Sequence, residues 1–169
     1  MSVFLQPIYT QTVGSGGASS ITFNNIPQTF TDLKVVVSGR TNVSATLDYF
    51  LVQPNGATTN LSGTRIQGNG SAASSARYTA LYVPVDGATA TANSFGNVEV
   101  YIPNYTSSNF KSMICDAVAE SNTSAMYQEL WAFLWSSTSA ITSLTIGNGG
   151  QNFVQYSTFS LYGVLRNGI

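Results

Sequence analysis

The stretch Asn97-Val98-Glu99-Val100-Tyr101-Ile102 alternates polar and apolar side chains along most of its length. In an extended strand, successive side chains point to opposite faces. The alternation therefore predicts a strand that buries Val98, Val100 and Ile102 and leaves the other face open to water. These three residues are β-branched, which strands favour. The stretch predicts a sheet that packs one face on a hydrophobic core.

The same period of two recurs along the rest of the chain. Further strands are predicted at 21–24, 33–38, 47–53, 77–85, 141–146 and 159–165. The dipeptides Asn55-Gly56, Asn69-Gly70 and Asp86-Gly87 separate these segments and tolerate the positive φ angles of tight turns. Short strands separated by such turns are typical of a β-sandwich or β-barrel.

Residues 110–135 fit two descriptions. Their apolar side chains match helical spacing, but the same residues also form two strands, 111–120 and 125–135, with apolar groups on both faces. The strand interpretation is favoured because the region is rich in aromatic residues and every other element is β.

We therefore expect an all-β fold, a jelly-roll-like antiparallel β-sandwich of about eight to ten strands. The length of 169 residues suits a single domain spanning 1–169. Within it, residues 1–19 are expected to form an N-terminal segment and a flexible connection.

Charge is scarce and excludes several kinds of site. The chain has six Lys or Arg and seven Asp or Glu, which is 8% of its residues, against about 25% in ordinary domains. Histidine is absent and Cys115 is the single cysteine, so a Ser-His-Asp triad or a zinc site is not expected. Lys34 and Lys111 lie in no recognisable catalytic motif and are expected on solvated strand faces. We predict no enzyme activity, cofactor or metal.

The positive charges are scattered, so no groove for nucleic acid is expected. No segment has the features of a signal peptide or the ~20 apolar residues of a membrane helix. We expect a protein made in the cytoplasm that binds neither nucleic acid nor membrane. Cys115 lies in an apolar run and is expected to be buried.

The aromatic residues are the candidate binding residues. In the strand interpretation, one face of 125–135 carries Tyr127, Trp131, Phe133 and Trp135, and the other carries Met126, Leu130 and Leu134. Two alternatives stay open. The strand is buried on both sides, or one face is the core and the other is an intersubunit contact or a sugar-stacking surface.

A second candidate aromatic site lies near Pro103. Tyr101 and Tyr105 flank this proline and could be exposed together. Ordinary surface tyrosines are the alternative.

Three segments carry a family resemblance. They are Ile21-Thr22-Phe23-Asn24-Asn25-Ile26-Pro27-Gln28-Thr29-Phe30-Thr31-Asp32-Leu33, then Asn93-Ser94-Phe95-Gly96-Asn97 leading into Val100-Tyr101-Ile102-Pro103-Asn104-Tyr105, and finally Phe159-Ser160-Leu161-Tyr162-Gly163. Together they resemble small virion structural proteins of tailed bacteriophages, especially those that infect cyanobacteria.

The resemblance implies a β-sandwich on the outside of a virion. Such a protein is a capsid decoration (cement) protein that binds the major capsid protein, expected as a homotrimer. The alternative is a tail or tail-fibre module that binds host-surface glycans. The resemblance brings no catalytic residues.

Overall fold

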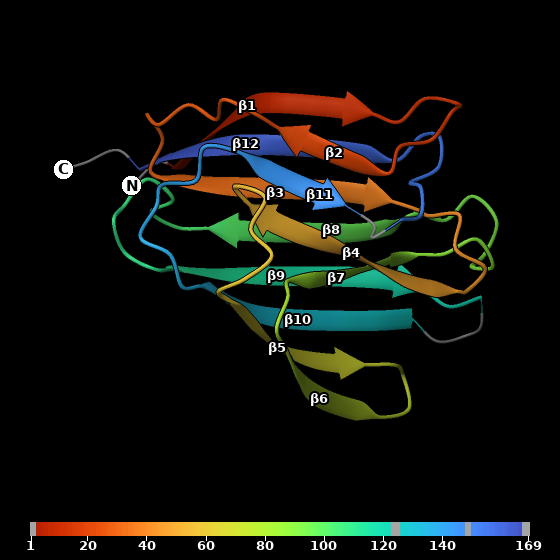
Figure 1. Cartoon of the computed structure of the whole chain (residues 1–169). Coiled ribbons are helices and arrows are strands. Elements are labelled where there is room, and N and C mark those ends of the chain that lie inside the picture. The colour runs from red at the N-terminus through yellow and green to blue at the C-terminus, as the bar shows by residue number, and fades with distance from the viewer. Residues whose placement is uncertain (1–2, 123–125, 148–149, 167–169) are drawn as a thin grey trace.

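The fold was analysed in a computed structural model that describes residues 3–122, 126–147 and 150–166. Twelve strands in these residues form two antiparallel sheets that face each other (Figure 1). In spatial order the large sheet contains β1 (Val3–Thr12), β12 (Thr158–Arg166), β3 (Asp32–Gly39), β8 (Gly96–Ile102), β9 (Lys111–Glu120), β10 (Met126–Trp135), β5 (Leu61–Gly68) and β6 (Ala73–Tyr78). The small sheet contains β2 (Ser20–Phe23), β11 (Leu144–Gly147), β4 (Leu47–Pro54) and β7 (Tyr82–Asp86).

The connections follow a jelly-roll pattern. Strands pair from the inside of the sequence outward as β5 with β6, β4 with β7, and β2 with β11, as in a long hairpin that has been rolled up. In that scheme β3 would lie beside β10, but the hairpin of β8 and β9 is inserted between them. The predicted jelly-roll-like β-sandwich is confirmed.

The described residues form twelve strands, where about eight to ten were expected, and some of the bounds differ from the expectation. Residues 111–120 and 126–135 are strands, as favoured. The segment at 77–85 is two strands in different sheets, because the chain crosses from β6 to β7 at 79–81. The N-terminal segment contains a full edge strand, β1, which pairs along its length with β12.

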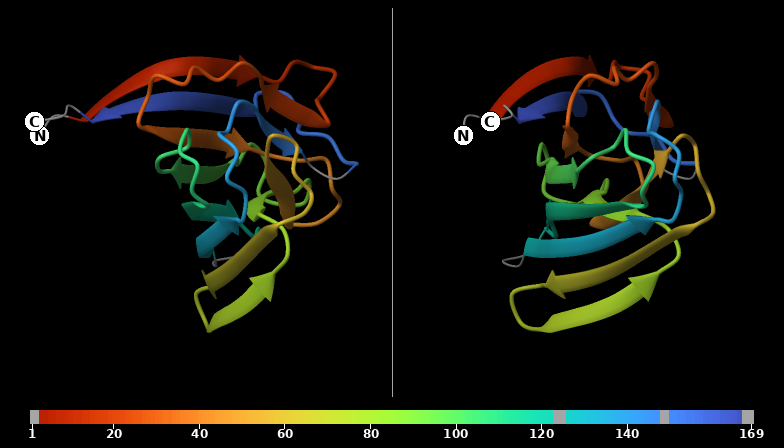
Figure 2. Two further views of the ribbon diagram at one scale, coloured as in Figure 1. Left: turned by 60° about the vertical axis from the view of Figure 1, so that its left-hand side comes forward. Right: turned by 90° about the vertical axis from the view of Figure 1, so that its left-hand side faces the viewer.

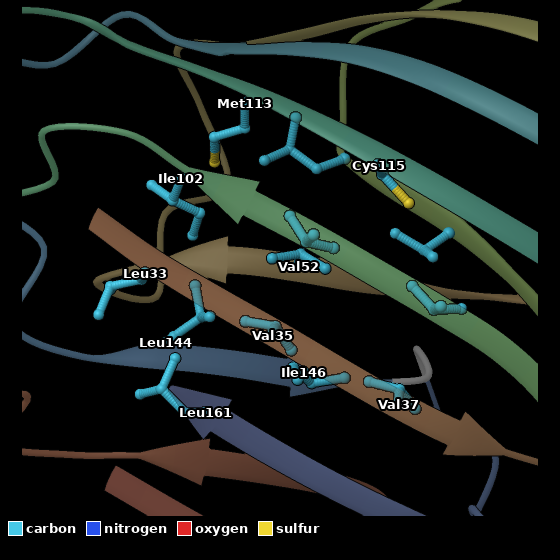
Figure 3. Close-up of a cluster of buried hydrophobic side chains, with 14 of the residues drawn as sticks. Leu33, Val35, Val37, Val52, Ile102, Met113, Cys115, Leu144, Ile146 and Leu161 are labelled. Atoms are coloured by element: carbon cyan, nitrogen blue, oxygen red, sulfur yellow. The ribbon is translucent and has the colours of Figure 1, made fainter. Parts of the chain in front are cut away.

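The core lies between the two sheets (Figure 3). Side chains from β3, β8, β9 and β12 of the large sheet meet those of β4 and β11 of the small sheet. The buried residues drawn and labelled there are Leu33, Val35, Val37, Val52, Ile102, Met113, Cys115, Leu144, Ile146 and Leu161. Cys115 is buried as predicted, and burial raises the pKa of its thiol.

The loop between β7 and β8 is held by two charged side chains. The guanidinium of Arg40 donates hydrogen bonds of 2.7 to 3.3 Å to Ala88 O, Ala90 O, Thr91 O, Ser94 O and Ser94 Oγ. The buried carboxylate of Asp86 accepts from Ser94 Oγ at 2.5 Å and from the backbone N–H of Glu120 at 2.8 Å. Arg40 and Asp86 thus provide hydrogen-bond partners for polar groups in and beside this loop that would otherwise lack them.

Close packing at Gly163 provides a first test of the fold. A Cβ at Gly163 would lie 2.3 Å from the ring of Phe30, whereas a Cβ at Gly68 would meet nothing within 4 Å. We expect Gly163→Ala to lower the free energy of unfolding by about 1–3 kcal/mol. Gly68→Ala is the matched control and should leave it unchanged or slightly raised. Equal unfolding midpoints in urea for the two variants would contradict this packing.

The carboxylate of Glu120 provides a pH-dependent test. It accepts hydrogen bonds from the backbone N–H groups of Thr91 and Asn122, both at 2.6 Å, and these contacts lower the pKa of Glu120. A lowered carboxyl pKa contributes stability that is complete above the ordinary Glu value of about 4.3 and is lost as pH falls through the folded-state pKa.

We therefore expect the Thr91 amide resonance to titrate in NMR spectra with a midpoint below the ordinary Glu value. Glu120→Gln should abolish this titration. A midpoint at or above the ordinary value would contradict the hydrogen bonds.

Candidate functional site

The small sheet covers one face of the large sheet and leaves the opposite face open. We call this open side the outer face. Its residues follow from the register, in which Leu130 of β10 lies opposite Asp116 of β9 and Ile66 of β5, while Ile114 lies opposite Ala132.

Apolar side chains are exposed on the outer face. Ile114 is 64% exposed, Ile66 58%, Met126 54% and Leu130 51%. They come from three adjacent strands, β9, β10 and β5. Large contiguous clusters of exposed apolar side chains are typical of surfaces that contact another molecule.

Two hollows lie along this face. The larger has a volume of about 940 Å³ and crosses β9, β10, β5 and β6. Small side chains, among them Ser62, Thr64 and Ala132, leave this space unfilled. The second, of about 360 Å³, lies between Leu5 and Ile114, so Ile114 borders both hollows.

The exposed charges gather on the same face. Among the described residues, Arg77, Glu99 and Asp116 are the charged side chains that are exposed rather than partly or fully buried. Each points outward, because it alternates with buried or inward neighbours along β6, β8 or β9. Glu99 lies directly opposite Asp116, and Lys34 pairs with Glu99 at 2.9 Å. The outer face therefore combines aliphatic groups with the few exposed charges.

The predicted aromatic surface is not on this face and needs correction. Trp131, Phe133 and Trp135 are buried in the core between the sheets, and Tyr127 is half-buried on the same side of β10. The sandwich buried the aromatic side of β10 and exposed the aliphatic side. The intersubunit or sugar-stacking surface considered for these residues is therefore not accessible at Trp131, Phe133 or Trp135.

The second aromatic site is also not assembled at the surface. Tyr105 is fully buried and donates a hydrogen bond to the carbonyl oxygen of Pro27. Burial raises the pKa of Tyr105. Tyr101 is half-buried and borders the smaller hollow, and its hydroxyl donates to the buried carboxylate of Asp32 at 2.5 Å. Of this pair, Tyr101 alone belongs to the outer face.

A buried carboxylate explains how β10 can turn its aromatic side inward. Glu129 lies among these aromatic residues and is fully buried. Its Oε1 accepts from the hydroxyl of Tyr49 at 2.9 Å, from Arg65 Nη1 at 3.3 Å and from Gln67 Nε2 at 2.5 Å. Its Oε2 accepts from Trp131 Nε1 at 2.8 Å. Four donors replace the water that the carboxylate loses.

The same cluster changes the properties of its tyrosine. Burial, followed by the negative charge of Glu129, raises the pKa of Tyr49 above its ordinary value. The guanidinium of Arg65 lies 5.8 Å from the ring centre of Trp131, within range of a cation–π interaction. The cluster joins β4 of the small sheet to β5 and β10 of the large sheet.

Lys111 also departs from the expectation of a solvated lysine. It is buried, and its Nζ donates to the carbonyl oxygens of Ser107, Asn109 and Ser139 at 2.6, 2.7 and 2.7 Å. These bonds use all three of its donor hydrogens. Burial lowers the pKa of Lys111. Its role is to join the loops before β9 and after β10.

The described residues contain no cluster of three or more Cys, Asp or Glu side chains that could hold a metal ion. None of the elements described is a helix able to span a bilayer. What the outer face offers chemically is a binding surface of aliphatic groups, hydroxyls and isolated charges.

Comparison with protein-family models, with curated proteins and with solved structures gave no match for this chain. The resemblance to phage virion proteins therefore stays a prediction from the sequence.

The Glu129 cluster gives a stability prediction. Glu129→Gln removes the negative charge that balances Arg65, whose side chain is 14% exposed. We expect a loss of about 3–5 kcal/mol in the free energy of unfolding, because an unbalanced charge stays buried. Glu99→Gln, which changes an exposed carboxylate, should cost less than about 1 kcal/mol. Similar costs in the two variants, measured by urea unfolding, would contradict the cluster.

Proposed function

We propose that this protein is a structural component of a virion, a capsid decoration protein that binds the outer capsid shell through the outer face of its large sheet. The observation that carries the proposal is the cluster of exposed aliphatic side chains on β5, β9 and β10. Exposing such side chains to water costs free energy, and the free energy of the system falls when a neighbour covers them.

The pattern of charge supports an assembly role. Exposed charges on the described surface are few: Arg77 of β6 and Glu99 of β8 flank the aliphatic cluster, and Asp116 lies beside Leu130 within it. An apolar centre with a polar rim is the usual composition of a protein interface. The shell surface that fits it carries a complementary apolar patch and a basic group near Asp116.

Three parts of the proposal rest on the family resemblance alone. These are the location in a virion, the major capsid protein as the partner and the homotrimeric state. The second candidate, a tail or tail-fibre module that binds glycans, loses most of the residues first suggested for it, because Trp131, Trp135 and Tyr105 are buried.

The copy number of the protein per particle tests the proposal. Quantitative mass spectrometry of purified particles should find many copies distributed over the shell, and particles that lack the protein should lose heat resistance. A few copies confined to the tail would contradict a decoration role and favour the second candidate.

A surface substitution tests the docking face. Leu130→Asn should reduce binding to particles that lack the protein by about tenfold or more, because it places a polar amide at the centre of the contact. Tyr156→Asn is the matched control, because Tyr156 is 68% exposed and lies in the loop between β11 and β12, away from the aliphatic cluster. Light scattering and thermal melting should confirm that both variants fold. Equal binding of the two variants would overturn the assignment of the face.

A further inference from the structure

A small hollow lies at the side of the sandwich where the chain passes from one sheet to the other. It has a volume of about 160 Å³ and is lined by Tyr49 of β4, Tyr78 of β6 and Tyr82 of β7. Tyr78 is the last residue of β6 and Tyr82 the first of β7. In Figure 2 the ribbon of β5 and β6 extends past the small sheet at this side. Three rings from three strands therefore converge at this side of the sandwich.

The rings are held in place by the core. Tyr78 packs against Trp131 with ring centres 4.9 Å apart, and its ring meets that of Tyr82 edge-on at 5.7 Å. Tyr49 is fixed by its hydrogen bond to Glu129. Tyr82 is 37% exposed, so it is the ring that a ligand in solution meets. A preformed aromatic surface of this kind loses little entropy when it binds.

A cationic ligand does not fit this hollow. Aromatic rings attract cations, but the guanidinium of Arg65 already lies 6.0 Å from the ring centre of Tyr49 and 5.5 Å from that of Tyr78. Arg65 forms an ion pair with Glu129, so this cluster has no net charge with which a charged ligand could pair. The position favours a neutral ligand.

The neighbouring polar groups favour a ligand that carries hydroxyls. The larger hollow of the outer face also reaches Tyr78 and Tyr82, and it is bordered there by Arg77 and Thr79. The guanidinium of Arg77 and the hydroxyl of Thr79 thus lie next to the aromatic surface and can hydrogen-bond a ligand that extends beyond it.

We propose that the Tyr49–Tyr78–Tyr82 hollow binds one ring of a neutral saccharide, and that Arg77 and Thr79 hydrogen-bond the next unit. One face of a sugar ring presents C–H bonds, whose partial positive charges suit the negative face of a tyrosine ring. Its hydroxyl groups supply acceptors and donors at the rim. This site goes beyond the proposed binding to a capsid shell. Its three tyrosines lie outside the aliphatic cluster of the outer face, whereas Arg77 and Thr79 border the larger hollow of that face.

Calorimetric titration of the full chain tests the site. The probes are neutral oligosaccharides of glucose, of mannose, of galactose and of N-acetylglucosamine, each at millimolar concentration, and choline as a cation. We expect at least one oligosaccharide to bind and choline not to bind. Failure of every oligosaccharide to bind, or displacement of the bound one by choline, would overturn the proposal.

Variants locate the binding. Tyr82→Ala should weaken it about tenfold or more, and Tyr82→Phe should keep most of it, because the ring remains. Tyr156→Ala is the matched control, because Tyr156 is 68% exposed and does not line the hollow. Arg77→Ala, at an exposed position, should weaken binding severalfold and serves if Tyr82→Ala does not fold. Undiminished binding in the Tyr82 and Arg77 variants would place the saccharide elsewhere.

The two proposals can fail separately. Leu130→Asn should leave saccharide binding unchanged, since Leu130 does not line the hollow. Loss of all saccharide binding with intact binding to particles would overturn this inference alone.

Discussion

The large sheet has eight strands and the small sheet has four, so the small sheet can cover one face of the large one and no more. Each strand places alternate side chains on opposite faces. The outer face must therefore be solvated or be covered by another molecule. Aliphatic residues of β5, β9 and β10 occupy it, and this mismatch between exposure and hydrophobicity is the basis of the assembly proposal.

The scarce charges are largely turned inward. Asp86 and Arg40 hold the loop between β7 and β8, Lys111 joins two other loops, and Glu129 organises the side of the core. Each contacts groups that would otherwise lack partners. The consequence is a surface suited to contact through shape, aliphatic groups and hydroxyl groups more than through long-range electrostatics.

Local patterning predicts most of the strands. The alternation at 97–102 and the aliphatic runs at 33–38 and 159–165 identify strands of the large sheet, and two-faced segments at 111–120 and 126–135 are central strands. The break at 79–81 was missed because Leu81, Val83 and Val85 continue the period of the segment that precedes them. When the chain crosses from one sheet to the other, the alternation of apolar side chains can continue unchanged, so the sequence does not reveal the crossing.

The orientation of β10 could not be predicted, because both of its faces are apolar. The deciding group is Glu129, whose partners Tyr49 and Arg65 lie 80 and 64 residues away in the sequence. A carboxylate among aromatic residues signals exposure unless those partners are known. The spacing of Glu129 and Trp131, two residues apart on one face, is the local signal that accompanies their hydrogen bond. The tyrosine hollow is equally nonlocal, because its rings come from β4, β6 and β7.

The central claim is that a neighbour covers the outer face in the assembled particle. Hydroxyl-radical footprinting read by mass spectrometry tests it through the two methionines of adjacent strands. Met126 is 54% exposed on the outer face and Met113 is buried in the core. The account predicts rapid oxidation of Met126 in the free protein, strong protection of it in the particle, and slow oxidation of Met113 in both. Equal oxidation of Met126 in the free protein and in the particle would contradict the account.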